Sequence, residues 1–443
     1  MRLRPISTLL LALLLAVGTC DYYFGLLLPE SRRKTEANAM STHYSYGGDF
    51  YPIWLTGRAL LTHKADRTDP YTPEMTRSIQ TGLYGRPMDP QRPSDPPPDY
   101  RAFSYPLYTD LLAAPLLPFD FSAVRVVLSL LIVPLTGASV LLWMGAFRIQ
   151  IPRAILTIFI ILTLTSYPVL EGLYALQAGL FVGAALALSV AALACNRMWL
   201  SGILLALASV KPQMVWLFAA FLLLWAASDW PRRKGFALGF LLTMALLCAA
   251  SQFLLPGWFS GWWHSLATYS GYTLPPLPQL LLGKYAGSAV SLALLALAST
   301  VCWKIRHHRA GSAEFSLCVS LVLTVTAILL PTGGAVYDQV ILLPAIFWLW
   351  SRRHEIAGAS HPLRVLALAA LVALFWQWIT ASAVAVISLA WPHWTHTPAV
   401  LVFPTRMAAP LPFVVIAILA FFAAKSSRGQ TKKPDATRAP ATA

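Results

Sequence analysis

Residues 122–147, "SAVRVVLSLLIVPLTGASVLLWMGAF", carry a single charged side chain, Arg125. A helix that crosses a bilayer needs about 20 apolar residues and satisfies its own backbone hydrogen bonds there. The stretch therefore predicts a membrane-spanning helix. Further apolar blocks occur near residues 6–28, 154–170, 179–195, 199–210, 213–228, 236–255, 286–303, 313–330, 339–350, 364–390 and 405–424.

The composition agrees with this pattern. Hydrophobic residues make up 57% of the 443 residues and charged residues only 12%, whereas a soluble domain carries about 25% charged residues. We therefore expect an all-α polytopic membrane protein with about twelve transmembrane helices. Some of the blocks are too short to cross alone, so we expect them to be tilted or re-entrant.

The net charge of +15 follows from membrane topology. With residues 1–5 placed in the cytoplasm, the linkers at 148–153, 229–235, 304–311 and 351–364 and the tail all fall on one side, and each is basic. Cytoplasmic loops are enriched in Lys and Arg. We therefore expect an inner-membrane protein with both termini in the cytoplasm and no nucleic-acid partner.

This topology divides the chain into four parts. They are a first transmembrane helix at 1–28, a large outer, periplasmic loop at 29–121, a helical bundle at 122–424 and a disordered cytoplasmic tail at 425–443. The N-terminus would also suit a cleaved signal peptide, but its apolar run continues through "DYYFGLLL" and favours an uncleaved span.

The large loop combines helical segments with a proline-dense strip. "IWLTGRALL" has helical spacing, and "YPLYTDLLAAPLLPFDF" suits an interfacial helix lying on the membrane. Between them, residues 87–98, "PMDPQRPSDPPP", predict an extended, mobile strip.

Signatures of soluble enzymes are missing from the sequence. There is no GxxxxGK[ST], GxSxG or HExxH motif and no DxD pair to hold a metal on a nucleotide sugar. The five cysteines form no CxxC pair. We therefore expect no nucleotide donor, no cofactor and no metal ion.

Asp49, in "HYSYGGDFYPIWLTGRALL" (residues 43–61), has two interpretations. It follows two glycines and precedes Pro52, which is a good context for the N-cap of a helix. A carboxylate held at the outer membrane surface can also act as a general base if a hydroxyl comes within hydrogen-bond reach. The two roles are compatible.

Three basic residues on the outer side are exceptions to the charge rule, Lys211, Lys284 and Arg406. Lys211 and Arg406 stand at the outer mouths of spans, where Lys and Arg should be rare. Ordinary snorkelling at the interface explains each of them. The alternative is a pair of cations that neutralise a lipid phosphate.

Other polar residues also fall on the outer side. The aromatic loop "PGWFSGWWHSLATYSGY" predicts an interfacial belt or a platform for a sugar or lipid chain, with His264 among its polar groups. Acidic and amide residues close to span ends are candidates for binding sugar hydroxyls or a cation: Glu171, Gln177, Asp338 and Gln339.

Several short motifs resemble glycosyltransferase family 87, whose members are GT-C-type enzymes that take mannose from polyprenyl phosphate. They are "GGDFYPIWLTGRALL…DPY", "FSYP" with Tyr105, "EGLYALQAG", "SGILLALASVKPQ" and "YDQVILLPA". The layout of about twelve spans with an early large loop is also similar. The resemblance implies that Asp49 is the catalytic base and that Lys211 and Arg406 contact the donor phosphate.

We therefore expect an inverting transfer from a polyprenyl-phosphate sugar, mannose by the resemblance, to a lipid- or glycan-linked hydroxyl at the outer face, among membrane lipids. Two alternatives stay open. One is an O-antigen ligase or polymerase that uses a lipid diphosphate, although such enzymes carry their large outer loop late in the chain. The other is a lipid or sugar transporter, which would favour ionisable residues at mid-membrane and internal repeats.

Overall fold

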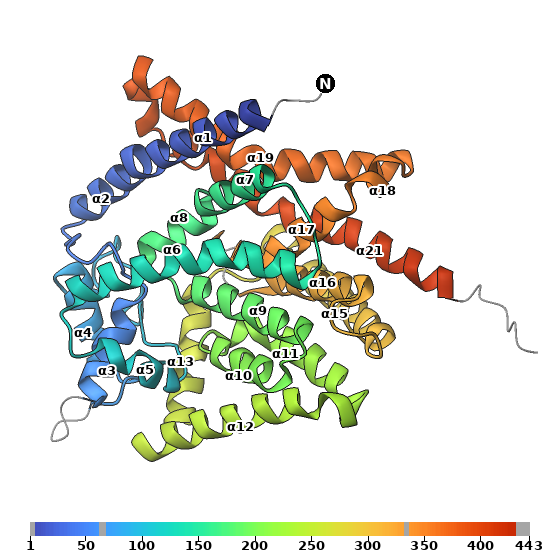
Figure 1. Cartoon of the computed structure of the whole chain (residues 1–443). Helices are drawn as coiled ribbons and strands as arrows, with labels where there is room; N and C mark the ends of the chain where they lie inside the picture. The colour runs from blue at the N-terminus through green and yellow to red at the C-terminus, as the bar shows by residue number, and fades with distance from the viewer. Residues whose placement is uncertain (1–4, 62–67, 332–335, 431–443) are drawn as a thin grey trace, which may run out of the picture.

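The computed structural model describes residues 5–61, 68–331 and 336–430. Within these ranges the chain is helical and forms no strand. Figure 1 shows long helices packed side by side, with the short helices α3, α4 and α5 gathered at one end of the bundle.

The helices fall into three groups along the chain. The N-terminal group is α1 (Pro5–Asp21), the π-helix η1 (Tyr22–Leu27), α2 (Leu28–Ala37), α3 (Tyr51–Leu61), α4 (Pro73–Tyr84), α5 (Tyr108–Ala113) and the 3-10 turn η2 (Ala114–Leu116). The middle group is α6 (Phe121–Ala146), α7 (Arg153–Leu164), α8 (Tyr167–Ala175), α9 (Ala178–Ala194), α10 (Met198–Ala208), α11 (Pro212–Ala227), α12 (Trp230–Leu254), α13 (Trp258–Tyr272), α14 (Leu277–Leu282) and α15 (Lys284–Ile305). The C-terminal group is α16 (Ala313–Leu329), η3 (Val336–Leu342), α17 (Leu343–Ser351), α18 (Arg353–Ala357), α19 (His361–Ala390), η4 (Pro392–His396), α20 (Pro398–Leu401), η5 (Phe403–Ala408) and α21 (Pro410–Gln430).

The predicted all-helical membrane architecture is confirmed, whereas the count of twelve spans is not. Six described helices are long and apolar enough to cross a membrane: Ile6–Ala37, Phe121–Ala146, Trp230–Leu254, Lys284–Ile305, His361–Ala390 and Phe403–Lys425. The pair α7 and α8, bent by 51°, would make a seventh. Five other apolar helices have only 10–17 residues, which is short of the roughly 20 that a span needs.

The first helix runs further than the predicted end at residue 28. It continues without a break through η1 and α2 to Ala37. Glu30 pairs with Arg33 at 2.7 Å and with Lys34 at 3.7 Å, one helical turn away. Such pairs stabilise a polar extension of a helix.

The last helix also passes the predicted boundary. α21 extends to Gln430, so the first residues of the expected tail are helical. Residues 431–443 of that tail lie outside the described residues.

Small residues allow the helices of the bundle to pack closely. A Cβ at Gly202 of α10 would lie 2.2 Å from the backbone oxygen of Phe236, and a Cβ at Gly239 of α12 would lie 2.6 Å from that of Trp199. Backbones can approach this closely only where side chains are absent, as at many helix contacts in membranes.

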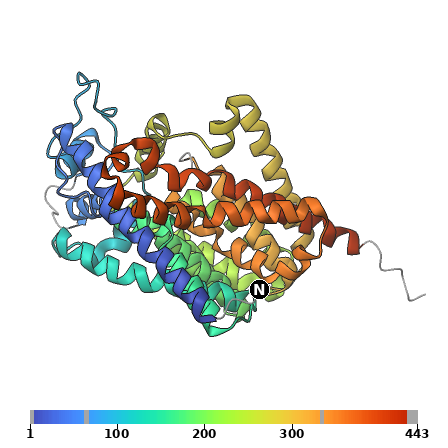
Figure 2. The ribbon, with the colours of Figure 1, turned by 90° about the horizontal axis from the view of Figure 1, so that it is seen from above.

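The helices of the large loop appear as predicted, on both sides of the proline strip. α3 contains "IWLTGRALL", and α5, "YTDLLA", covers six residues of the predicted segment "YPLYTDLLAAPLLPFDF". Figures 1 and 2 place these helices at one end of the bundle, while α1 begins and α21 ends toward the other.

The proline strip itself is fixed at both ends. The buried Gln80 side chain accepts from Met88 N and donates to the carbonyl oxygens of Pro98 and Tyr100, at 2.7–2.9 Å. Arg86 forms a bidentate ion pair with Asp95 at 2.5 and 2.7 Å. The strip lacks helix and strand, as expected, but its backbone oxygens are used as anchors.

Candidate active site

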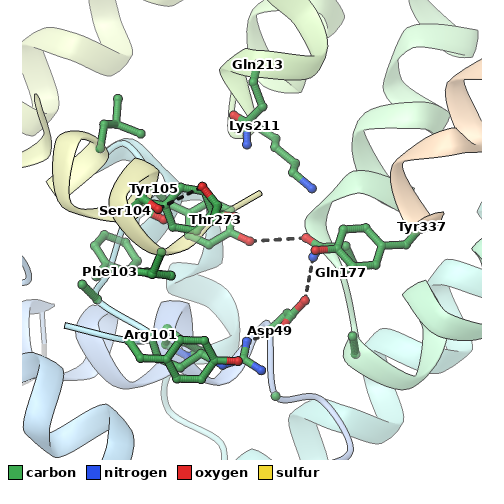
Figure 3. A pocket seen from close by; sticks show the side chains of 18 of the residues that line it. Asp49, Arg101, Phe103, Ser104, Tyr105, Gln177, Lys211, Gln213, Thr273 and Tyr337 are labelled. Atoms are coloured by element: carbon green, nitrogen blue, oxygen red, sulfur yellow. Dashed lines mark hydrogen bonds and ion pairs between the residues drawn. The ribbon is translucent and has the colours of Figure 1, made fainter. Parts of the chain in front are cut away.

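A cavity of about 430 Å³ opens between the short helices and the bundle. Its walls come from segments that are distant in sequence: residues 45–52, 100–105, 171–177, 210–213 and 266–274, together with Tyr337. Figure 3 shows polar side chains from these segments pointing into the space.

Backbone hydrogen bonds fix the position of Asp49 on the wall of this cavity. Gly47 N donates to Tyr174 O at 2.8 Å, and Asp49 N donates to Ala175 O at 3.0 Å. Gly47 has φ +82°, a left-handed conformation that glycine adopts without strain. The two glycines before Asp49 therefore let the chain turn against the end of α8.

The carboxylate of Asp49 is held by two side chains. Arg101 Nη1 donates to Oδ1 at 2.5 Å, and Gln177 Nε2 donates to Oδ2 at 2.7 Å. The side chain is 17% exposed, so a ligand in the cavity can reach it.

The interpretation of Asp49 as a helix cap is wrong. The backbone N–H groups of Phe50 and Tyr51 donate to Gly47 O, and Pro52 has no N–H to offer. The side chain of Asp49 is therefore left for contacts across the cavity.

Arg101 is a site residue that the sequence analysis missed. It has φ +69°, which is uncommon for a residue with a Cβ and is found most often at functional sites. Arg101 Nε donates to Tyr84 Oη at 3.0 Å, and the preceding carbonyl, Tyr100 O, is held by Gln80. No motif marked Arg101, because it follows a strip that was expected to be mobile.

Tyr105 and Gln177 form a chain with Asp49. Tyr105 Oη donates to Gln177 Oε1 at 3.3 Å, and Gln177 donates onward to Asp49, as Figure 3 shows. Burial, together with the charge of Asp49, raises the pKa of Tyr105 well above its usual value. Tyr105 therefore stays a neutral donor, and the amide of Gln177 has a fixed orientation.

Lys211 extends into the cavity from the opposite wall. Its Nζ lies 2.6 Å from Asp338 Oδ1 and 4.9 Å from the centre of the Tyr337 ring. The side chains of Lys211 and Asp338 are 6% and 1% exposed. Asp338 thus holds the lysine from behind and does not itself line the cavity.

Glu171 lines the cavity near the end of α8. Its Oε2 accepts from Tyr23 Oη of the first helix at 2.7 Å. Five of the predicted residues therefore border one space: Asp49, Tyr105, Glu171, Gln177 and Lys211.

Besides Asp338, three predicted residues lie outside this cavity. Arg406 is an exposed residue of η5, and Gln339 donates to Ala408 O at 2.8 Å. Both predictions relied on a position at the outer end of a span, and residues on one side of a membrane can be far apart laterally.

His264 also lies outside the cavity, and its position on α13 explains why. On α13, Ser265 and Trp262 donate to the backbone oxygens of Phe103 and Ser104, and Tyr269 and Tyr272 line the cavity. These positions recur every three or four residues and so share one face of the helix. His264 is exposed, off this face. The 3–4 spacing was the signal that could have identified Tyr269 and Tyr272.

The arrangement offers a carboxylate beside a cation, with a second cation across the cavity. In the parts of the chain that the structure describes, no three His, Cys, Asp or Glu side chains are grouped so that they could hold a metal ion.

Comparison with known proteins identifies the family. The sequence profile of glycosyltransferase family 87 matches residues 103–331, just over half of the chain. The chain belongs to glycosyltransferase family 87. The match includes Tyr105, Glu171, Gln177 and Lys211, and it ends before Asp338. Neither a curated protein nor a solved structure matches this glycosyltransferase.

Membership has direct consequences for function. The protein is a membrane glycosyltransferase, and it binds a sugar donor and an acceptor. This excludes the transporter interpretation as its main activity.

Proposed function

We propose that this glycosyltransferase moves a sugar, mannose, from a polyprenyl-phosphate donor to a hydroxyl of a lipid- or glycan-linked acceptor. The transfer takes place at the outer face of the membrane, in a GT-C-type arrangement, with inversion at the anomeric carbon. The observation that carries the proposal is the position of Asp49 in the large cavity, partly exposed and facing Lys211.

Asp49 is the general base of this reaction. Its carboxylate removes the proton of the acceptor hydroxyl while the hydroxyl oxygen forms a bond to the anomeric carbon. The bond from that carbon to the phosphate oxygen breaks, and the polyprenyl phosphate leaves with the bonding electrons. A base must lie within hydrogen-bond reach of the proton that it removes, and the open side of Asp49 provides that access.

Lys211 and Arg101 stabilise the departing phosphate. Both line the cavity, and preorganised cations lower the energy of charge that develops on a leaving group. Arg101 takes the role that the sequence alone suggested for Arg406. Asp338 keeps Lys211 in place, since its buried carboxylate is the closest partner of the ammonium group.

Asp49→Asn tests the base. General-base catalysis contributes about 10²–10⁴-fold, so transfer from a labelled polyprenyl-phosphate sugar should fall by about that factor. Asp99→Asn is the matched control, because Asp99 is an exposed carboxylate of the same loop. Wild-type turnover by Asp49→Asn, with an unchanged thermal transition in detergent, would refute the mechanism.

The donor class is tested separately. Membranes that contain the protein should transfer label from a polyprenyl-phosphate sugar but not from the same sugar on a polyprenyl diphosphate. A preference for the diphosphate would favour the ligase or polymerase alternative.

A further inference from the structure

A second cavity, of about 480 Å³, lies away from the candidate active site. It opens between α7, α17, α18, α19 and α21, at the end of the bundle opposite to α3–α5 (Figure 1). Most of its lining is aliphatic or aromatic, including Phe159, Leu349, Ala370, Leu371, Val415 and Ile418. These walls suit hydrocarbon chains.

Two arginines line the same cavity, Arg353 and Arg364. Within the described residues, neither makes an ion pair with a carboxylate. The neighbouring Arg352, which does not line the cavity, pairs with Glu355 at 2.5 Å. The apolar space therefore has two guanidinium groups available to an anion.

Trp350 positions Arg353 at the cavity. It lines the cavity, and its indole Nε1 is buried without a hydrogen-bond partner among the described residues. The guanidinium of Arg353 lies 4.8 Å from the centre of the Trp350 ring and donates to Trp350 O at 3.1 Å. These contacts hold the guanidinium of Arg353 beside the apolar space.

We propose that this cavity is a binding site for an anionic phospholipid. The acyl chains occupy the apolar groove, and the phosphate lies on Arg353 and Arg364. This site is separate from the sugar transfer. It takes its lipid from the leaflet on the side of the basic linkers.

The C-terminal segment of the chain itself is a less suitable occupant of the cavity, because its charge has the wrong sign. Residues 431–443, "TKKPDATRAPATA", carry three basic residues and one acidic residue, so two arginines would repel this segment. An anionic lipid has the opposite charge together with the apolar surface that the groove requires.

The test measures lipid retention by the purified full-length protein. The protein is equilibrated with phosphatidylglycerol and phosphatidylcholine of equal acyl chains, and bound lipid is counted by native mass spectrometry. Each Arg near an anionic membrane surface favours an anionic lipid about fivefold, so two of them predict a preference for phosphatidylglycerol of about 30-fold.

Two variants locate the site. Arg353→Gln with Arg364→Gln should abolish the preference, whereas Arg352→Gln with Arg232→Gln, which removes the same charge outside the cavity, should keep it. Ala370→Phe fills the groove and leaves both arginines in place, so it should lower the retention of either lipid. Equal retention of both lipids by the wild type would overturn the proposal, as would an unchanged preference after the loss of Arg353 and Arg364. Sugar transfer by these variants stays at the wild-type level, because none of the residues lies in the candidate active site.

Discussion

The carboxylates of Asp49 and Asp338 have different roles because their surroundings differ. Asp49 is 17% exposed, and its partners Arg101 and Gln177 stand at the edge of an open cavity. Asp338 is 1% exposed and paired with Lys211. Only Asp49 can meet a substrate hydroxyl, while Asp338 can act only through the lysine.

Replacing Arg101 tests its contact with Asp49. Arg101→Gln should lower the transfer rate at saturating substrates by about 10–100-fold, because hydrogen bonds to charged groups are worth about 1.5–3 kcal/mol. Arg101→Lys should restore part of the rate, since it restores the charge without the fork geometry.

The control for this experiment is Arg92→Gln. Arg92 is an exposed arginine of the same loop and does not line the cavity. If Arg101→Gln changed only the thermal transition, and not the turnover of the folded protein, Arg101 would be structural.

At the scale of elements, the start of α9 brings together the two sides of the cavity. Leu176 has φ +50°, which turns the chain between α8 and α9 and presents Gln177 to Asp49. Two residues later, Gly179 leaves space for the ion pair of Lys211 and Asp338.

Gly179→Ala should therefore destabilise the protein. The new Cβ would lie 2.6 Å from Asp338 Oδ1 and 3.6 Å from Lys211 Nζ, and overpacking typically costs about 1–3 kcal/mol. Gly145→Ala in α6 is the matched change, because its Cβ would meet nothing within 4 Å. There alanine should stabilise the helix slightly, by less than the roughly 0.5–1 kcal/mol expected in the middle of a helix, because Gly145 lies close to the end of α6. The midpoint of thermal unfolding in detergent should fall for Gly179→Ala and rise for Gly145→Ala. Equal shifts of the two midpoints would contradict the packing argument.

The ion pair between Arg86 and Asp95, here called the clip, predicts how fast the backbone of the proline strip exchanges hydrogen. Arg86→Gln should speed hydrogen exchange in residues 86–101, whereas Arg77→Gln, which breaks an exposed pair on α4, should leave it unchanged. Arg86 holds the pKa of Asp95 well below its usual value. The clip therefore contributes its full stability above the ordinary carboxyl pKa, about 3.9, and loses it as the pH falls through the lower folded value. Fast exchange at neutral pH in the wild type would show that the clip is not formed.

The sequence predicted well where the helices form. It predicted poorly which helices lie beside one another. Apolar blocks determine where helices form, so α6 lies within one residue of its predicted ends. Asp49, Gln177 and Lys211 were found because each is unusual for its place in a membrane protein. Arg101 was missed because its position depends on backbone anchors such as Gln80, which leave no periodic pattern in a sequence.

At the scale of the whole molecule, the charges and the fold agree. Asp49 lies in the turn before α3, and Figure 1 shows the short helices α3, α4 and α5 at one end of the bundle and α18, which begins at the basic residue Arg353, toward the other. A charge asymmetry of this kind orients helices in the membrane.

Cysteine labelling tests this orientation. A membrane-impermeant maleimide should label Ser94→Cys, at the exposed tip of the proline strip, in intact cells. It should label Arg309→Cys, in a basic linker, only after permeabilisation. The wild-type chain gives the background from its five cysteines. Labelling in the reverse order would place the cavity in the cytoplasm.

With the topology proposed here, the length of the unbroken first helix indicates how deep the cavity would lie in the bilayer. The 17 residues of α1 rise about 26 Å at 1.5 Å per residue, which is close to the roughly 30 Å of the hydrocarbon core. The π-helical turn that follows therefore lies near the boundary between hydrocarbon and headgroups. Tyr23 of this turn bonds Glu171 on the cavity wall, so it ties the floor of the cavity to that height. In the proposed orientation a lipid phosphate would lie at this level, and the proposed lipid-linked donor would reach the cavity by lateral diffusion without being lifted out of its leaflet.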